Sequence, residues 1–163
     1  MTSKGLHEVL KNLHWIVGRW QSVNAAVFYP TMNKTVKFNE ILEFQNVGQP
    51  LLAYSSITTN PETKAFMHLE KGWLRVDEDQ CTLAFLVAMN LGLSTLEEGY
   101  VKDNHIVLRT ACLGVMKFVK QSVLSLHRCY RLNEKGELEY NLMMETPNTP
   151  LTKHVEAIYT KEK

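Results

Sequence analysis

The chain has 163 residues, which is the size of one domain and enough to bury roughly two-thirds of the surface that the unfolded chain exposes. Its composition, 45% hydrophobic and 21% charged, is that of a globular protein and excludes a disordered chain. The net charge is only +1, with Lys and Arg spread in ones and twos, so we expect neither a nucleic acid nor a membrane as a partner.

The N-terminus, Met-Thr-Ser-Lys-Gly, lacks an apolar signal core, and the longest nearly uncharged stretch, 80–97, is too short and mixed to span a bilayer. We therefore expect a cytoplasmic location, which could extend to the nucleus. Cys81, Cys112 and Cys129 are odd in number, lie in separate apolar runs and have no CxxC spacing. We interpret them as buried thiols in a reducing compartment, with no disulfide.

One clear helical period lies near the N-terminus. Apolar residues fall at i, i+3, i+4 and i+7, at Leu6, Val9, Leu10 and Leu13. This spacing places one apolar stripe along about three turns. It predicts a short amphipathic N-terminal helix that ends before Gly18.

From Trp20 onward, short runs rich in β-branched and aromatic residues recur roughly every ten to fifteen residues, separated by clusters of Gly, Pro, Asn and Asp. These runs predict strands near 20–28, 36–45, 51–59, 66–76, 81–88, 94–101, 105–113, 115–119, 122–132, 137–146 and 154–161. The clearest alternation sets Leu126, Arg128 and Tyr130 on one face of the 122–132 run, opposite His127 and Cys129.

The order of these strands predicts how the sheet is built. No helical crossover separates them, so the sheet should be antiparallel and joined by hairpins. About ten such strands leave two exposed edges unless the sheet closes, so we expect an all-β fold with a closed barrel. A barrel of this size is wider than its own side chains fill and tends to enclose a ligand. A sandwich of two sheets is the alternative architecture.

The sequence motifs of common enzymes are missing. There is no G-x-S-x-G elbow, no P-loop, no G-x-G-x-x-G and no H-E-x-x-H. The carboxylate groups at Glu97-Glu98 and Asp77-Glu78-Asp79 fall at predicted turns or strand ends. We interpret them as solvated charge rather than as catalytic pairs.

Two histidines at the edges of apolar runs are the candidates for a binding site. His68 follows Met67, and His154 lies shortly after Pro150 and Leu151. A lone neutral imidazole can hold haem iron from one side. Most methionines also lie in or beside apolar strands, where they suit either core filling or the wall of a flat apolar ligand site: Met67, Met89, Met116, Met143 and Met144.

Several short motifs, taken in order, resemble the nitrobindin family, which also forms the C-terminal domain of certain THAP-domain proteins. They are Gly18-Arg19-Trp20, Tyr29-Pro30-Thr31, Val47-Gly48-Gln49-Pro50-Leu51, Met67-His68, Glu98-Gly99 and Asn148-x-Pro150-Leu151-x-x-His154. The similarity covers about residues 6–161, and it implies that residues 1–163 form one domain.

This resemblance implies a ten-stranded antiparallel barrel, similar to fatty-acid-binding proteins, that holds ferric haem b near its mouth. His154 matches the family's only protein ligand to the iron, Met67 and His68 match a pair close to the haem, and Met144 matches an apolar pocket residue. Members of the family bind nitric oxide and isomerise peroxynitrite to nitrate, so haem and these nitrogen oxides are the implied partners. Whether the chain forms a homodimer is left open.

The residues give that chemistry a physical basis. A single imidazole leaves the sixth iron position open, and a wall without an adjacent acid or base favours binding of a small diatomic. His68 could shape the open side, or it could be purely structural. The chain departs from the family's G-x-W-x-G-x-G pattern, because Ser22 and Asn24 replace two glycines and could crowd the haem face.

Other functions share the same predicted barrel. The main alternative is a haem-free carrier of fatty acid or another hydrophobic ligand. A pure interaction domain is a third possibility.

Overall fold

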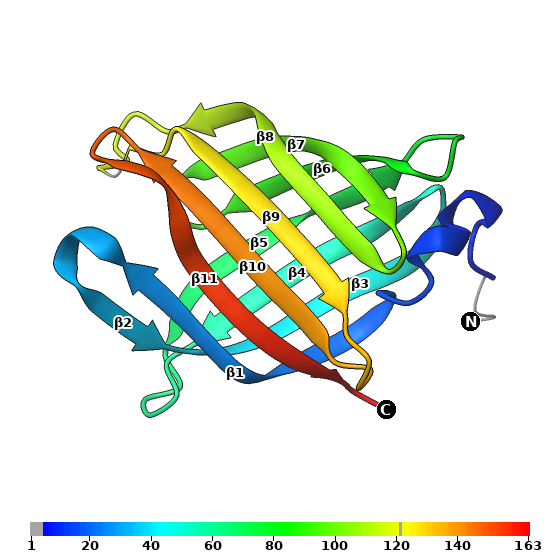
Figure 1. The fold of residues 1–163 in the computed structure, drawn as a ribbon, viewed down its shortest axis with the longest axis horizontal. Coiled ribbons are helices and arrows are strands. Elements are labelled where there is room, and N and C mark those ends of the chain that lie inside the picture. The colour runs from blue at the N-terminus through cyan, green and yellow to red at the C-terminus, as the bar shows by residue number, and fades with distance from the viewer. Residues whose placement is uncertain (1–4, 121) are drawn as a thin grey trace.

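A computed structural model, which describes residues 5–120 and 122–163, shows one antiparallel sheet wrapped into a barrel (Figure 1). Two short 3-10 helices are present, η1 (Glu8–Leu13) and η2 (Pro30–Met32). The strands are β1 (Gly18–Tyr29), β2 (Lys34–Lys37), β3 (Asn39–Gln49), β4 (Leu51–Thr59), β5 (Phe66–Val76), β6 (Thr82–Met89), β7 (Leu93–Lys102), β8 (His105–Val115), β9 (Ser125–Leu132), β10 (Leu138–Thr146) and β11 (Thr149–Lys161).

The sheet closes through its first long strand. Strands β3 to β11 each pair with the next, and β11 pairs back onto β1, so ten strands form the barrel and β2 is an addition to it. The other edge of β1 is divided: residues 18–21 pair with β3, and residues 26–29 pair with β2. Closure confirms the predicted barrel and excludes the sandwich.

The strand predicted near 115–119 is wrong. β8 ends at Val115, and the following residues fold back over the turn between β6 and β7, where Met116 N–H donates to the Gly92 carbonyl at 2.9 Å. Val119 N–H in turn donates to the Met116 carbonyl at 3.0 Å, which makes a turn instead of a ladder. This apolar run therefore lies at the mouth of the barrel, the open end at the left in Figure 1, and leaves Met116 and Phe118 exposed.

The N-terminal helix is shorter and tighter than predicted. It is a six-residue 3-10 helix, and its buried side chains, Leu10 and Leu13, are followed three residues later by buried Ile16. A spacing of three matches the three residues per turn of a 3-10 helix, which stacks these side chains in one row. They belong to the main core and close the right-hand end of the barrel in Figure 1. No helix within 5–120 and 122–163 is long and apolar enough to cross a membrane.

The cysteines are less buried than predicted. Cys81 and Cys112 are exposed and Cys129 is half-buried, and all three are free thiols. Cys129 lies between Arg128 and Tyr130, which are both buried, so the alternation of β9 turns its thiol away from the interior. An apolar run on a strand contains residues of both faces, and Cys129 lies on the outer one. Cys81 lies in the turn just before β6, where its thiol donates to the Val101 carbonyl at 3.3 Å.

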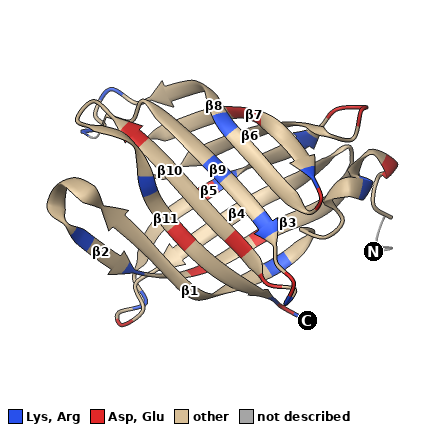
Figure 2. Ribbon diagram, in the orientation of Figure 1, with Lys and Arg blue, Asp and Glu red and all other residues tan. Residues whose placement is uncertain are grey.

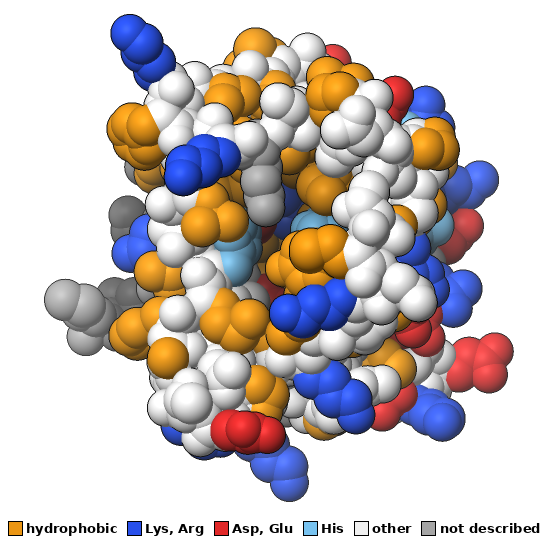
Figure 3. Space-filling view, turned by 90° about the vertical axis from the view of Figure 1, so that its left-hand side faces the viewer, with side chains coloured by type: hydrophobic (Ala, Val, Ile, Leu, Met, Phe, Trp, Pro, Cys, Tyr) orange, Lys and Arg blue, Asp and Glu red, His pale blue; other side chains and the backbone are white. Residues whose placement is uncertain are grey.

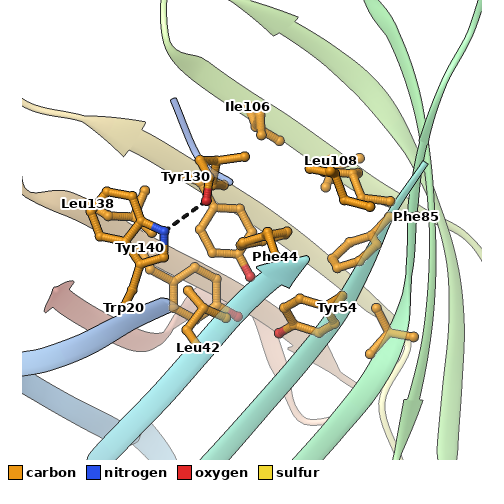
Figure 4. Close-up of a cluster of buried hydrophobic side chains, with 14 of the residues drawn as sticks. Trp20, Leu42, Phe44, Tyr54, Phe85, Ile106, Leu108, Tyr130, Leu138 and Tyr140 are labelled. Carbon is orange, nitrogen blue, oxygen red and sulfur yellow. Dashed lines mark hydrogen bonds between the residues drawn. The ribbon is translucent and has the colours of Figure 1, made fainter. Parts of the chain in front are cut away.

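The closed half of the barrel is filled by aromatic side chains (Figure 4). Tyr130 and Tyr140 stack with ring centroids 4.8 Å apart, and Phe44 meets the edge of Tyr130 at 5.5 Å. Trp20 packs in the same core, and its indole N–H donates to the Ile16 carbonyl at 2.8 Å. The opposite half of the interior, toward the left-hand end of the barrel in Figure 1, contains a cavity.

Candidate functional site

A cavity of about 330 Å³ opens at the left-hand end of the barrel in Figure 1, and Figure 3 looks into it. An outer recess of about 540 Å³ adjoins it and shares four of its lining residues: Tyr29, Val123, Met144 and His154. Cavities of these sizes are typical of small-molecule sites. Most of the inner wall is apolar, and most of its polar side chains come from three neighbouring strands, β3, β4 and β5, with His154 contributed by β11.

A β-bulge turns His154 into this cavity. Val155 pairs with Leu142 and Lys153 pairs with Met143, so His154 is an extra residue on β11 without a partner on β10. Strict alternation would place His154 on the outer face, because Val155 lies on the inner one. The bulge interrupts the alternation, and both residues line the cavity.

The hydrogen bonding of His154 determines which ring nitrogen is free. Its Nδ1 lies 3.2 Å from the Phe28 carbonyl oxygen, which can only accept, so Nδ1 carries the hydrogen. Burial lowers the pKa of His154, and the bond to Phe28 opposes this only in part. The ring is therefore a neutral imidazole near neutral pH, with the Nε2 lone pair unprotonated. Tyr29 contacts the ring edge-on at a centroid distance of 5.8 Å.

A second bulge presents Met67 and His68. On β5, Leu69 pairs with Ile57 and Phe66 pairs with Thr59, so Met67 and His68 together oppose only Thr58. The Thr58 hydroxyl accepts from His68 N–H at 2.7 Å and donates to its carbonyl at 3.0 Å, replacing the missing ladder bonds. Both side chains face the cavity as a result.

The structure brings all four predicted site residues to one cavity. His154, His68, Met67 and Met144 line it together, with Met89 also in the wall. Ser22 and Asn24, predicted to crowd the site, line neither the inner cavity nor the outer recess. Asn24 is exposed, and the Ser22 hydroxyl accepts from Glu40 N–H at 2.8 Å.

Sequence analysis missed a buried charged cluster beneath the cavity. Arg128 is fully buried, and its Nε and Nη2 bond the two oxygens of Glu97 at 3.1 and 3.2 Å. Its Nη1 bonds Glu70 at 3.1 Å, and the other oxygen of Glu70 accepts from Nε2 of His68 at 2.9 Å. The chain His68–Glu70–Arg128–Glu97 thus runs from the cavity wall into the core.

Electrostatics hold Glu70 as a carboxylate. Burial alone would raise its pKa, but the charge of Arg128, with the bonds from His68 and Tyr54, lowers the pKa of Glu70 well below its usual range. Burial likewise opposes the charge on Arg128, and its two carboxylate partners raise the pKa of the guanidinium well above the usual value. Each charge therefore stabilises the other.

A third acid, Glu40, lines the same cavity in a different state. The hydroxyls of Ser56 and Tyr159 donate to its two oxygens. No cation among the described residues bonds it, so burial raises the pKa of Glu40, and the two hydroxyls offset this only in part. The cavity therefore holds one carboxylate that favours the charged form and one that favours the neutral form.

Two sequence predictions are wrong here. Glu97 is 1% exposed rather than solvated, whereas the Asp77–Asp79 group does lie in a surface turn. The cavity wall was predicted to have no adjacent acid or base, but it contains His68, Glu40 and Glu70. The sequence signal for the buried acids was the alternation of side chains along each strand. Glu70 lies on the same face of its strand as buried Leu74, and Glu40 lies on the same face as buried Leu42.

Comparison with known proteins identifies the family of this chain. The family described as "THAP4-like, heme-binding beta-barrel domain" matches residues 9–161. Peroxynitrite isomerase THAP4 from Homo sapiens is 32% identical over 158 residues, covering 96% of this chain but only 27% of that protein. The chain thus spans about a quarter of the length of that relative. Peroxynitrite isomerase 1 from Rhodococcus jostii is 34% identical over 139 residues, covering 85% of this chain and 76% of that protein.

Among solved structures, the crystal structure of Rv2717c from M. tuberculosis superposes with a TM-score of 0.86 at 28% identity, covering 98% of this chain and 100% of that one. The sequence match spans the whole barrel and includes both bulges that line the cavity. The chain therefore belongs to the THAP4-like, heme-binding β-barrel family.

Proposed function

We propose that this barrel binds haem b as ferric iron through His154 and isomerises peroxynitrite to nitrate. The observation that carries the proposal is the bulge at His154, which directs a neutral imidazole into an apolar cavity with Nδ1 tied to the Phe28 carbonyl. A backbone acceptor on one ring nitrogen fixes the tautomer and leaves the other to ligate a metal.

The surrounding residues fit a flat apolar ligand. Met67, Met89 and Met144 offer flexible, polarisable side chains that adapt to such a surface. Most of the other residues that line the cavity are aliphatic or aromatic. When bound, haem would be held through the His154 imidazole and would supply an iron centre that acts as a Lewis acid toward the substrate. Isomerisation conserves every atom and electron, so the chain need only hold the haem, exclude water and orient the anion.

His68 is the polar side chain that we assign to the substrate side. Its Nε2–H points at the Glu70 carboxylate, which fixes the ring on the wall formed by β5. In the proposed complex it would orient peroxynitrite, and the same side would bind nitric oxide. Relatives named peroxynitrite isomerase, which cover 96% and 85% of this chain, support the proposed activity.

The alternative function, carriage of a fatty acid, is not supported by the polar residues that line the cavity. A carrier of a carboxylate needs a cation available to it, but every nitrogen of Arg128 is already bonded within the protein. The acids that reach the cavity, Glu40 and Glu70, would repel a fatty-acid headgroup or compete with it for donors.

Titration with haemin tests the role of His154. Wild-type protein should give a five-coordinate ferric Soret spectrum, and His154→Ala should lose it while keeping the circular dichroism of the barrel. His127→Ala is the matched control, because His127 lies on β9 between two inward-facing residues and so points outward. If His154→Ala binds haemin with unchanged spectrum and affinity, the assignment is wrong and His68 becomes the candidate.

Activity requires a second measurement. Peroxynitrite should decay faster with haem-loaded protein than with apo-protein, and free tyrosine in the same solution should be nitrated less. Nitric oxide should shift the Soret band reversibly. A six-coordinate low-spin resting spectrum, with decay no faster than in apo-protein, would leave a haem carrier in place of an enzyme.

A further inference from the structure

The turns between strands at the two ends of the barrel differ in charge, although the net charge of the chain is only +1 (Figure 2 marks the charged residues). Turns at the mouth, with the first residue of β2, contain four lysines, Lys34, Lys64, Lys117 and Lys120, and one carboxylate, Glu62. Turns at the closed end contain one lysine, Lys135, and six carboxylates, Asp77, Glu78, Asp79, Asp103, Glu134 and Glu137. The turns at the mouth are therefore basic and the turns between strands at the closed end are acidic, while the terminal segments beside the closed end carry charges of both signs, Glu8, Lys11, Lys161, Glu162 and Lys163.

The same mouth exposes large apolar side chains at the tips of its turns. Phe118, in the β8–β9 connection, is 77% exposed, and Phe66, the first residue of β5, is 74% exposed. Met32 in η2, Leu91 in the β6–β7 turn and Met116 in the β8–β9 connection are also exposed. Figure 3 shows such apolar and basic side chains around the hollow. Turns at the closed end expose no comparable aromatic ring among the described residues.

We propose that the mouth of the barrel docks on an anionic membrane surface, inserting Phe66 and Phe118 while the lysines approach the lipid headgroups. Aromatic and aliphatic side chains inside a ring of lysines are the composition that binds at a bilayer interface. Each lysine near an anionic leaflet adds attraction that salt weakens. The acidic turns of the closed end would face away from the membrane, which gives the barrel one docked orientation.

The geometry favours a membrane over a protein partner. The exposed rings come from separate segments around an opening and have lysines among them, whereas protein interfaces are depleted in lysine. Docking in this orientation places the cavity entrance against the lipid. An apolar ligand could then pass between bilayer and cavity without crossing water. Only this last step rests on the proposed function; docking itself does not.

Vesicle flotation of the haem-free and haem-loaded chain tests the proposal. Vesicles of phosphatidylcholine with phosphatidylserine should carry the protein to the top of the gradient, phosphatidylcholine alone should carry much less, and high salt should release it. Phe66→Asp with Phe118→Asp should reduce flotation several-fold, and so should Lys34→Glu with Lys117→Glu. His154→Ala should float like the wild type, so loss of haem binding and loss of docking are separable.

Matched controls lie elsewhere on the barrel. Trp73→Asp alters an exposed ring on the outer wall, and Lys135→Glu reverses a lysine at the closed end. Both should float like the wild type, and circular dichroism should show every variant folded. The proposal is overturned if the wild type stays at the bottom with anionic vesicles, or if the controls lose flotation as much as the mouth variants. Retained flotation by both mouth variants, or binding only to a protein, overturns it equally.

Discussion

The two halves of the barrel interior are built from the same strands but serve different purposes. In the closed half, strict alternation directs Phe44, Phe85 and Tyr130 inward to fill the space with ring contacts at centroid distances near 5 Å. In the mouth half, bulges at His68 and His154 break the alternation and line a cavity. Regular pairing thus supplies the stability and irregular pairing supplies the binding site.

Between the halves lies the layer of Arg128 and its partners. Buried side-chain nitrogen and oxygen atoms in the described part of the chain all have hydrogen-bond partners, including those of this layer. A buried ion pair contributes little net stability compared with an apolar pair of the same shape, but losing one member is costly. The layer should therefore respond to mutation more strongly than either half.

Arg128→Met should have the largest effect. It leaves Glu70 and Glu97 buried without their cation, which should lower the free energy of unfolding by about 3–5 kcal/mol. Urea unfolding followed by tryptophan fluorescence measures this. Arg131→Met is the control, because Arg131 pairs with Glu139 with its side chain 59% exposed and should lose about 1 kcal/mol or less. Equal losses in the two variants would contradict the importance of the layer.

The packed half and the hollow half should differ in their response to truncation. Leu108→Ala removes a fully buried side chain and should cost about 2–5 kcal/mol, because the neighbours relax only in part around the new void. Met144→Ala borders space that already exists and should cost about 1 kcal/mol or less. Paired urea titrations compare them. If Met144→Ala costs as much as Leu108→Ala, the mouth half is as tightly packed as the core.

The sequence predicts the regular half of this architecture well. Alternating runs and turn residues place nearly every strand, and the absence of crossovers gives the antiparallel barrel, because these features depend on local periodicity. Gly99, part of one family motif, has a purely local reason: a Cβ there would lie 1.8 Å from the Val107 carbonyl oxygen of the next strand.

The irregular half is not predictable from periodicity. Alternation counted back from buried Tyr159 and Ala157 places Val155 inside and His154 outside, and only a bulge reverses this. The similarity to a family identified His154 where the pattern could not. The partners of Arg128 were missed because Glu97 lies 31 residues away along the chain, and only the pairing of β7, β8 and β9 brings them together.

The two cavity acids should give opposite pH dependence. Glu40 has a pKa raised above 4.5, so the folded state binds its proton more tightly and loses stability as pH rises from 4.5 through that raised value. Glu70 has a lowered pKa, so its contribution is present above 4.5 and is lost as pH falls toward the lowered value.

Isosteric amides separate these contributions. Relative to the wild type, Glu40→Gln should gain stability as pH rises above 4.5, because it removes the ionisation that burial opposes. Glu70→Gln should lose stability at neutral pH, and the loss should shrink as the solution becomes acidic. Urea midpoints across the pH range measure both differences. Parallel curves for the two variants would show that Ser56 and Tyr159 stabilise a charged Glu40 after all.

The smallest effect concerns the thiols, which lie outside both halves. Because Cys81, Cys112 and Cys129 are all free, excess reductant should leave the thermal midpoint unchanged.

The reactivity of the three thiols should still differ. Cys81 and Cys112 are exposed and should react quickly with a thiol reagent in the folded protein. Cys129 is half-buried, and burial raises its pKa, so less thiolate is present and it should react more slowly. Mass spectrometry of the labelled protein measures the order. A midpoint that falls by several degrees in reductant would show that a disulfide supports the barrel.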